Sequence, residues 1–423
     1  MVKRPGNSKY VKKMNRMLVL NIIKKHELVS RQELSTLTGL TPPAITGIIR
    51  QLLEMGFIKE VGLGTSSGGR KPVKIQLNSD AGYVIGIEVT RYETLIGIAD
   101  LKNDPTDINR MALDMSDPEQ GMPLFINMIR KLIDSKAYAG KKFLGIGLAF
   151  PGLLDVKAGR VTRSVNLGPG WRDFPLTATL EKSLGLPVFL ENNSKAAVLA
   201  ERWFGGGTDC RDLVYVNLGE GISAGIIMDD HILRGHAGHV GQIGHIVVLE
   251  NGPRCNCGNY GCLEALCGIP ALLRKTIADM HFIDSQDPLK AVWALRGEIS
   301  IEDILTTAQV EGSYSWNLLQ QVGNTVGLVL ANVINLYNPE VVFIGGKLAV
   351  AAKVFIDCLR HTVDTHTFPE MAKSTQIKIS PLGGHSCVIG SCALVLQELF
   401  KLTQSDIMTD YQLLLANQAN GSE

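Results

Sequence analysis

Four residues within an 18-residue stretch have side chains that can bind a soft metal ion. His245 is followed by Cys255, Cys257 and Cys262. One imidazole and three thiolates complete a tetrahedral shell, which is the closed coordination that zinc prefers in structural sites. Glycines between the ligands allow the tight turns that such a loop requires. A Cys255–Cys257 disulfide would be strained. We therefore predict one structural zinc ion per chain; the alternative is a glycine-rich turn that holds unrelated buried thiols.

The residues around these ligands form a longer pattern. Gly244 and His245 precede Cys-Asn-Cys-Gly at 255–258, and the stretch ends in Gly-Cys-Leu-Glu at 261–264. This pattern resembles the signature of the ROK family, which contains sugar kinases and transcriptional repressors. Where the family pattern has glutamate, this chain has Gln242. The resemblance covers nearly all of residues 79–400 and implies a two-lobed actin-like, ribonuclease-H-like α/β domain.

The resemblance also implies a sugar site. A sugar presents several hydroxyl groups, so its site needs amides, carboxylates and imidazoles at fixed positions. The residues that correspond to the sugar-binding positions of the family are Asn192, Asn193, Gln242, His245 and Glu264. His245 could bind the metal through one ring nitrogen and the sugar through the other. We expect the metal to hold His245 and Glu264 in register; the alternative is that the loop only stabilises the fold or an interface.

Two departures from the family's kinase motifs predict that the chain is not an enzyme. The kinases have Asp-x-Gly-Gly-Thr-Lys around the nucleotide phosphates, whereas residues 88–93 here read Glu-Val-Thr-Arg-Tyr-Glu. The kinases also use an aspartate to take the proton from the sugar hydroxyl. Asn193 stands at that position, and an amide has no useful basicity. Glycine-rich turns at 219–225 and 344–346 resemble further phosphate loops, but we favour a structural role for them.

The first 80 residues have the pattern of a winged helix-turn-helix. Apolar residues recur at helical spacing over 12–25. A capping box from Ser30 to Glu33 opens a second helix that stops at Gly39. Thr41 and Pro42 begin a third helix, which ends at Gly56. Residues 57–61 and 73–77 alternate as the two strands of a hairpin, with a loop over 62–72.

The third helix is the predicted recognition helix. Small or basic side chains on its outer face suit the floor and walls of a DNA major groove, and two cations in the hairpin loop suit a narrow minor groove. The predicted DNA-binding residues are Thr41, Pro43, Ala44, Thr46, Arg50, Arg70 and Lys71. A protein-docking module of the same fold is the alternative.

The charge distribution agrees with this division of the chain. Residues 1–80 contain 14 Lys and Arg against 5 Asp and Glu, a balance of +9, whereas the remaining residues contain 28 against 36, a balance of −8. A basic head on an acidic body suggests that the head meets a polyanion. Neither a membrane-spanning run nor a signal peptide is evident, so we expect a cytoplasmic protein without membrane contact.

These observations predict an N-terminal winged helix-turn-helix over 1–78 and a ROK domain over 79–423. Lobe I should span about 79–191 together with the C-terminal helix, and lobe II about 192–385. The predicted function is a kinase-inactive, sugar-responsive repressor of carbohydrate metabolism genes. Its partners would be double-stranded operator DNA, a small sugar and a second copy in a homodimer or tetramer. The alternatives are a repressor controlled by docking of a sugar-transport protein, and a bifunctional sugar kinase.

Overall fold

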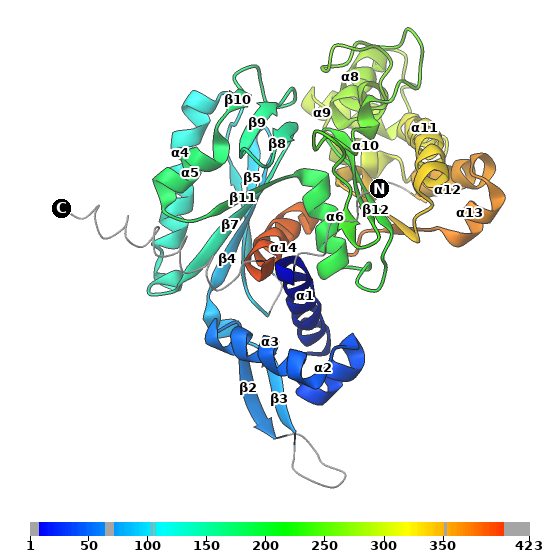
Figure 1. The fold of residues 1–423 in the computed structure, drawn as a ribbon. Coiled ribbons are helices and arrows are strands. Elements are labelled where there is room, and N and C mark those ends of the chain that lie inside the picture. Colours follow the sequence, from blue (N-terminus) through cyan, green and yellow to red (C-terminus); the bar gives the residue numbers. More distant parts are fainter. Residues whose placement is uncertain (1–7, 64–71, 103–104, 106, 351–352, 402–423) are drawn as a thin grey trace.

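The computed structural model describes residues 8–63, 72–102, 105, 107–350 and 353–401. They form a small N-terminal head below two larger lobes, each of which contains a five-stranded sheet (Figure 1). The fold therefore has the predicted α/β class, with a winged helix-turn-helix before a two-lobed body. Within this described part of the chain, no helix is both long enough and apolar enough to cross a membrane.

The head contains three helices and a three-stranded sheet in the order β1-β3-β2. Its elements are α1 (Ser8–His26), β1 (Val29–Ser30), α2 (Arg31–Thr38), α3 (Pro42–Glu54), β2 (Ile58–Leu63) and β3 (Val73–Leu77). The predicted capping box of α2 is present, because Ser30 and Glu33 each accept a hydrogen bond from the other's backbone amide. Thr41 occupies the N-cap position of α3 as predicted, but its side chain makes no capping bond.

Two features of the head differ from the prediction. Helix α1 begins at Ser8, four residues before the predicted start. Strand β1 was not predicted, because two residues carry no periodicity; it pairs with β3 through Val29 and Ser30. The predicted loop residues Arg70 and Lys71 lie outside the described residues.

Lobe I is built on the sheet β11-β7-β4-β5-β6, with a small second sheet β10-β9-β8. Its elements are η1 (Ser79–Ala81), β4 (Tyr83–Val89), β5 (Glu93–Asp100), β6 (Asp107–Ala112), α4 (Pro118–Ile133), η2 (Lys136–Tyr138), β7 (Phe143–Phe150), β8 (Leu153–Asp155), β9 (Arg160–Arg163), β10 (Arg172–Phe174), α5 (Leu176–Leu184), β11 (Val188–Asn192) and, from the end of the chain, η5 (Gly383–His385) and α14 (Ser386–Lys401). Helices α4 and α5 share one core cluster with the sheet, and α14 packs on β4 and β7.

Glycines in two strands allow α14 to lie directly on the sheet. A β-carbon at Gly147 would come within 1.9 Å of the Ser391 carbonyl oxygen, and one at Gly86 within 2.4 Å of the Val388 carbonyl oxygen. No other residue type fits there without moving the helix. Helix α14 is thus packed directly on the sheet of lobe I.

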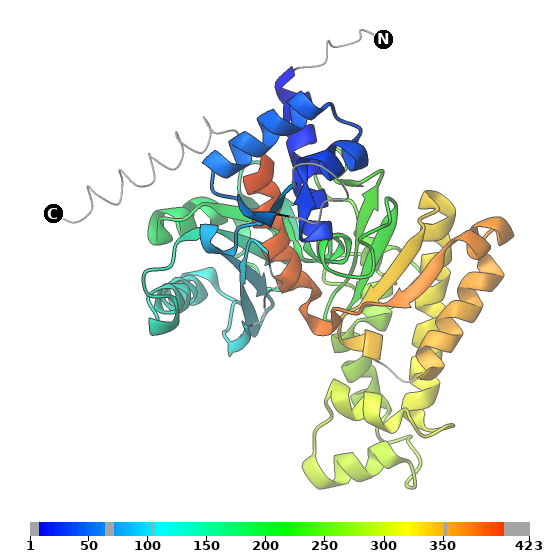
Figure 2. The ribbon, with the colours of Figure 1, turned by 90° about the horizontal axis from the view of Figure 1, so that it is seen from below.

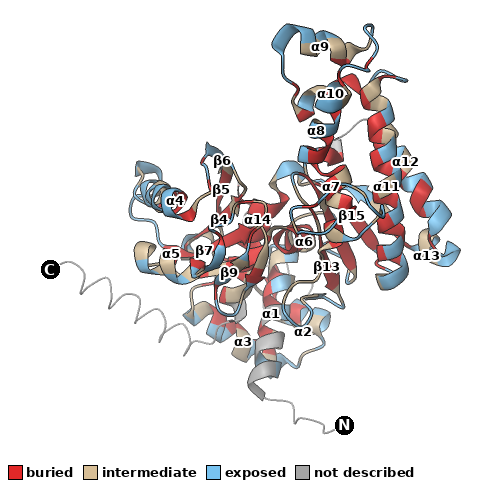
Figure 3. Ribbon diagram, turned by 90° about the horizontal axis from the view of Figure 1, so that it is seen from above, coloured by how far each residue is buried: buried red, intermediate tan, exposed pale blue. Residues whose placement is uncertain are grey.

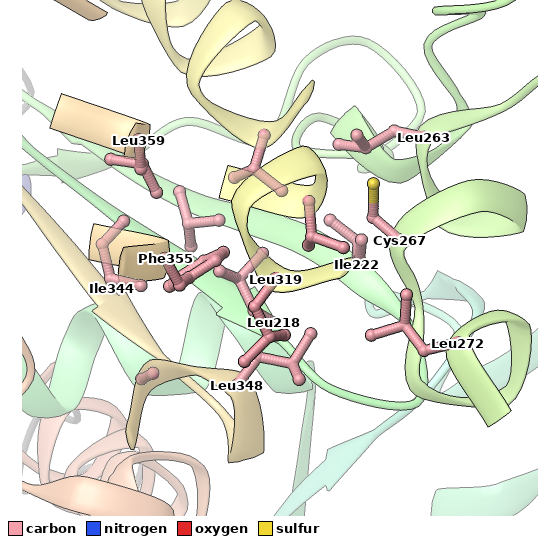
Figure 4. Close-up of a cluster of buried hydrophobic side chains, with 14 of the residues drawn as sticks. Leu218, Ile222, Leu263, Cys267, Leu272, Leu319, Ile344, Leu348, Phe355 and Leu359 are labelled. Carbon is pink, nitrogen blue, oxygen red and sulfur yellow. The ribbon is translucent and has the colours of Figure 1, made fainter. Parts of the chain in front are cut away.

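Lobe II is built on the sheet β14-β13-β12-β15-β16. Its elements are α6 (Asn193–Trp203), β12 (Leu213–Leu218), β13 (Ile222–Met228), β14 (His231–Ile232), η3 (Ile243–His245), α7 (Leu263–Cys267), α8 (Ile269–Asp279), α9 (Pro288–Arg296), α10 (Ile301–Thr307), α11 (Tyr314–Tyr337), β15 (Val341–Gly345), η4 (Lys347–Val350), α12 (Lys353–His366), α13 (Pro369–Ser374) and β16 (Gln376–Ile379). Its core joins the sheet to α11 and α12 through side chains such as Leu218, Leu319 and Phe355 (Figure 4).

Burial follows the layers of the body. Buried residues concentrate on the two sheets and on α14 between them, whereas α4, α9 and α13 present exposed faces (Figure 3). Seen from below, α14 (red) runs between the lobes and α1 of the head (dark blue) lies beside it (Figure 2). The head is therefore packed against the body. At the boundary between them, the Asn78 side chain donates a hydrogen bond to the Gly56 carbonyl oxygen and caps η1.

Candidate metal centre, ligand site and DNA-binding surface

The four predicted metal ligands lie together in the structure. Their ligand atoms are all within 4.8 Å of one another. His245 is placed by η3, and Cys262 by the N-cap position of α7. The intervening loop is folded back by an isolated bridge between Arg254 and Tyr260 and by a hydrogen bond from the Cys255 amide to the Asn259 carbonyl oxygen at 2.8 Å.

The distances in this cluster fit zinc. Bond lengths of about 2.3 Å to sulfur and about 2.0 Å to nitrogen put tetrahedral edges at about 3.8 Å between two sulfurs and about 3.5 Å between sulfur and nitrogen. Here Cys257 Sγ lies 3.8 Å from Cys262 Sγ, and Cys255 Sγ lies 3.6 Å from His245 Nδ1. Nδ1 is thus the nitrogen turned toward the thiols, which leaves Nε2 available for another partner. A metal ion would have to displace the thiol protons, since burial raises the pKa of Cys262 to about 12.

Glu264 directly follows the loop that contains the predicted metal ligands. This residue lies in the first turn of α7, two positions after Cys262. Its Oε2 accepts a hydrogen bond from the Ile222 amide at 2.9 Å, so the carboxylate is tied to the start of β13 while the residue stays half-buried. Gln242, which precedes η3, is also half-buried and does not cap that helix with its side chain.

The two adjacent asparagines have different environments. Asn192 caps α6 through its Oδ1, which accepts from the Ser194 amide at 3.1 Å, and its Nδ2 donates to the Gly152 carbonyl oxygen at 3.3 Å. Both ends of that amide therefore already have partners. Asn193 is the first residue of α6, and its Nδ2 donates to the Val89 carbonyl oxygen at 3.4 Å. Its Oδ1 is buried without a protein partner in the described structure.

Two further residues complete this site, and the sequence had not indicated either as a ligand-site residue. A β-carbon on Gly221 would come within 3.1 Å of Asn166 Nδ2 and within 3.0 Å of Glu264 Oε2, so these two polar groups converge beside the Gly221 backbone. Arg91 Nη1 donates to the Asn166 carbonyl oxygen at 3.4 Å. Arg91 Nε, like Asn193 Oδ1, is buried and lacks a protein partner in the residues described.

Polar groups from both lobes thus meet at the junction of the lobes. Arg91 and Asn166 come from loops of lobe I, Glu264 comes from lobe II, and Asn193 stands where the chain passes between the lobes. Unpartnered buried polar atoms cost about 1–3 kcal/mol each. A ligand rich in hydroxyl groups would supply the missing partners, because each hydroxyl both donates and accepts.

The turn after β4 lacks the features of a phosphate-binding loop. The Thr90 amide and the Thr90 hydroxyl both donate to the Glu93 carbonyl oxygen, each at 2.9 Å, so the turn is closed on itself. The Glu88 carboxyl lies against the Cys387 thiol, and burial raises the pKa of Glu88 to about 7 although part of the residue remains exposed. A carboxyl group that resists ionisation is a poor ligand for Mg²⁺, which binds carboxylates.

The glycine-rich turns of lobe II have packing roles. A β-carbon at Gly345 would come within 1.9 Å of Tyr215 Oη, and one at Gly346 within 2.4 Å of the Leu218 carbonyl oxygen. At the earlier turn, the Gly219 amide donates to the Gly221 carbonyl oxygen at 3.2 Å. Close packing accounts for Gly345 and Gly346 without a phosphate.

The outer face of α3 is open. Ile45, Ile49 and Leu52 are buried against the rest of the head. The predicted DNA-binding residues Thr41, Pro43, Thr46 and Arg50 are exposed and Ala44 is half-buried. Arg50 has no ion-pair partner among the described residues. The short side chains around it permit close approach to a groove floor.

Comparison with sequence families gives two matches. The model of the ROK family matches residues 84–398, and a winged helix-turn-helix DNA-binding model matches residues 15–59. A relative named "Putative xylose repressor" from Caldicellulosiruptor sp. (strain Rt8B.4) is 31% identical over 398 residues, which is 93% of this chain and 98% of that protein. The "DNA-binding transcriptional dual regulator NagC" of Escherichia coli (strain K12) is 29% identical over 391 residues, 92% of this chain and 94% of that protein.

Solved structures give the same result. A ROK family transcriptional regulator described as a homologue of the E. coli Mlc protein superposes with a TM-score of 0.79 at 28% identity, covering 93% of this chain and 97% of that chain. A ROK family glucokinase from Streptomyces griseus, solved with glucose and AMPPNP, superposes with a TM-score of 0.65 at 24% identity. That match covers 74% of this chain and 99% of the glucokinase. At this identity it shows only that the body of this chain and the glucokinase share a fold.

Proposed function

The chain belongs to the ROK family, and from that premise we propose that it is a sugar-responsive, DNA-binding transcriptional repressor of carbohydrate metabolism genes that has no kinase activity. The observation that carries the proposal is the combination of two features in one chain. A winged helix-turn-helix exposes its third helix, and polar groups with unpartnered atoms, among them Asn193 Oδ1 and Arg91 Nε, lie between the two lobes of the body.

The DNA-binding surface would consist of the exposed face of α3 and the loop after β2. Arg50 is long enough to reach a guanine edge or a phosphate, and Thr41 and Thr46 can donate to phosphate oxygens. Arg70 and Lys71 of the loop would enter the adjacent minor groove. The winged helix-turn-helix, residues 1–78, would bind the DNA, and residues 79–423 would bind the effector.

The effector would be a small sugar held at the lobe junction. Asn193, Gln242, His245 Nε2 and Glu264 would bind its hydroxyl groups, and Asn192 would fix the start of α6. The structural metal at His245, Cys255, Cys257 and Cys262 would be zinc; it would supply no chemistry beyond holding the His245 ring and the first turn of α7 in register.

We infer the absence of kinase activity from the groups that phosphoryl transfer to a sugar would require. An amide cannot take the proton from the attacking hydroxyl, and the Thr90 amide of the turn after β4 is already bonded to the Glu93 carbonyl oxygen. A bifunctional sugar kinase is the alternative. Purified protein that consumes ATP in the presence of a sugar would favour that alternative.

The proposed response is a shift of population. A sugar that binds better when the lobes are closed would favour the closed state. In a symmetric dimer this change would move the two heads relative to each other, so that both no longer fit half-sites about 34–36 Å apart or a multiple of that distance. A dimer is expected because one head makes few phosphate contacts and binds weakly at physiological salt.

The test begins with a duplex that the full-length protein selects from a random-sequence pool. We expect tight, salt-dependent binding of that duplex and at least tenfold weaker binding in the presence of one member of a panel: D-xylose, D-glucose, N-acetyl-D-glucosamine or their phosphate esters. Calorimetry of the same panel without DNA separates the remaining alternative, because a repressor relieved by a docked transport protein binds none of the free sugars. Failure to select any duplex would refute DNA binding.

A further inference from the structure

Helix α1 is anchored to lobe I by an apolar contact. Its buried residues Val19, Leu20 and Ile23 belong to the same core cluster as Val395 and Leu396 of α14. Helix α14 is packed directly on the lobe I sheet. Burial of these side chains removes apolar surface from water, so the contact holds α1 firmly on α14.

The end of the same helix is anchored to the other lobe by polar contacts. Lys24 Nζ lies 3.3 Å from the centroid of the Phe204 ring and 4.8 Å from that of Trp203, and it donates to the Trp203 carbonyl oxygen at 3.5 Å. Lys25 forms an ion pair with Asp209, which follows α6. These contacts are partly or fully exposed, so each is weaker and more easily exchanged than the apolar contact.

Helix α6 connects these contacts to the ligand site. Its first residue is Asn193 and its last is Trp203, which makes 11 residues, or about 16 Å at 1.5 Å per residue. It packs on β12 and β13 of lobe II, and the Ser194 and Ser223 hydroxyl groups are hydrogen-bonded. A displacement at the Asn193 end is therefore transmitted to Trp203 with little loss, because one short helix is stiff.

The two central helices are in contact through their backbones. A β-carbon at Gly390 of α14 would come within 1.7 Å of the Ala196 carbonyl oxygen of α6. Such a contact holds the two helices at close approach, and side chains of both also share apolar clusters. Any relative movement of the lobes along this interface would be a shear between α6 and α14, and α1 touches both of them.

We propose that α1 senses this shear: the contacts of Lys24 and Lys25 with the end of α6 form the interaction surface that couples the ligand site to the DNA-binding head. The inference rests on the proposed binding of DNA by the head and of sugar at the lobe junction. Because coupling is reciprocal, DNA bound to the head must change the behaviour of α6 just as a ligand changes that of the head. The coupling is thus measurable without knowing the sugar.

The experiment uses the full chain and the duplex that it selects from a random pool. Amide hydrogen exchange is followed by mass spectrometry over residues 193–203, with and without the duplex. We expect the duplex to slow exchange there by about fivefold or more, the lower end of ordinary allosteric coupling. In the variant with Lys24→Met and Lys25→Met, the duplex should still bind, but the slowing at 193–203 should be lost.

Two further variants control the comparison. Lys12→Met removes one lysine charge from an exposed position of α1 and should keep the slowing. Asp209→Asn breaks the Lys25 pair from the lobe II side at an exposed residue, and it should weaken the slowing even if the double variant folds poorly. The inference is overturned if the wild-type chain binds the duplex without any change at 193–203, or if the double variant or Asp209→Asn keeps the full change. A chain that binds no duplex at all refutes the proposed DNA binding instead.

Discussion

Cys257 tests the link between the metal and the ligand site. Cys257→Ser removes one of four ligands, so we expect loss of bound zinc, a lower melting temperature and loss of sugar binding, because His245 and Glu264 are no longer held in register. Elemental analysis, thermal melting and calorimetry measure the three effects. Cys358→Ser, which changes a thiol outside the cluster, should affect none of them. A metal-free protein with an undiminished sugar response would contradict the prediction.

Glu88 predicts a pH dependence of stability. Its carboxyl has a pKa of about 7 in the folded chain against an ordinary value of 4.5. Between these values the unfolded chain has lost this proton and the folded chain retains it. Stability therefore falls as pH rises from about 4.5 to 7, and the loss is complete above pH 7.

Glu88→Gln should remove that loss. We expect the variant to be more stable than the wild-type chain above pH 7, by at most about 3 kcal/mol, and equally stable near pH 4. Denaturant melts from pH 4 to 8 provide the measurement. Glu54→Gln, at an exposed position of α3, should leave the profile unchanged. Parallel profiles for Glu88→Gln and the wild-type chain would show that the carboxyl ionises normally.

The individual residues of the site were predictable to different degrees. The metal ligands lie close together in the sequence, so their spacing alone indicated the cluster. Arg91 and Asn166 are separated by 75 residues and meet only because the turn after β4 and the loop before β10 fold to one place. Arg91 lies in the stretch 88–93, which departs from the kinase motif, and Asn166 lies in no motif, so no sequence pattern could have paired them. The sequence indicated Asn192 as a residue of the site. It did not show that both the nitrogen and the oxygen of its side-chain amide already have hydrogen-bond partners in the protein.

At the scale of elements, the recognition helix is the part that can be tested alone. If the Arg50 side chain contacts a base, Arg50→Ala should weaken binding of the selected duplex by about 1–3 kcal/mol. If it contacts a phosphate, the slope of the logarithm of affinity against the logarithm of salt concentration should fall by about one. Fluorescence anisotropy at several salt concentrations separates these cases. Arg274→Ala removes the same charge from an exposed position of α8 and should bind as the wild-type chain does. If both variants bind the duplex with equal affinity, the DNA binds a surface other than the exposed face of α3 at Arg50.

Elements with a clear apolar pattern or a capping signal were predicted well, and the others were not. The apolar pattern predicts strands over 83–90, 94–101 and 143–150 and a helix over 316–336. The observed β4, β5, β7 and α11 lie within two residues of these ends. Helix α4 was predicted over 122–137 but runs from Pro118 to Ile133, because Asp117 caps it before the apolar pattern begins. The short strands β8, β9 and β10 pair only with one another, and such short segments carry too little periodicity to be recognised.

At the scale of the whole molecule, the prediction concerns the pairing of heads. A homodimer should protect two half-sites on the selected duplex, with centres about 34–36 Å apart or a multiple of that distance. Sedimentation of the free protein and footprinting of the complex test the two parts separately. Protection of a single half-site by a monomer would rule out the proposed release mechanism, although DNA binding itself would stand.

The shared core of head and body limits how such proteins can be recombined. Residues of the winged helix-turn-helix and of α14 belong to one apolar cluster although more than 300 residues separate them in sequence. A graft that joins this head at residue 78 to a foreign body would set Val19, Leu20 and Ile23 on a surface that did not evolve with them. Exchanging operator specificity between relatives should therefore require transplanting the second half of the final helix together with the head.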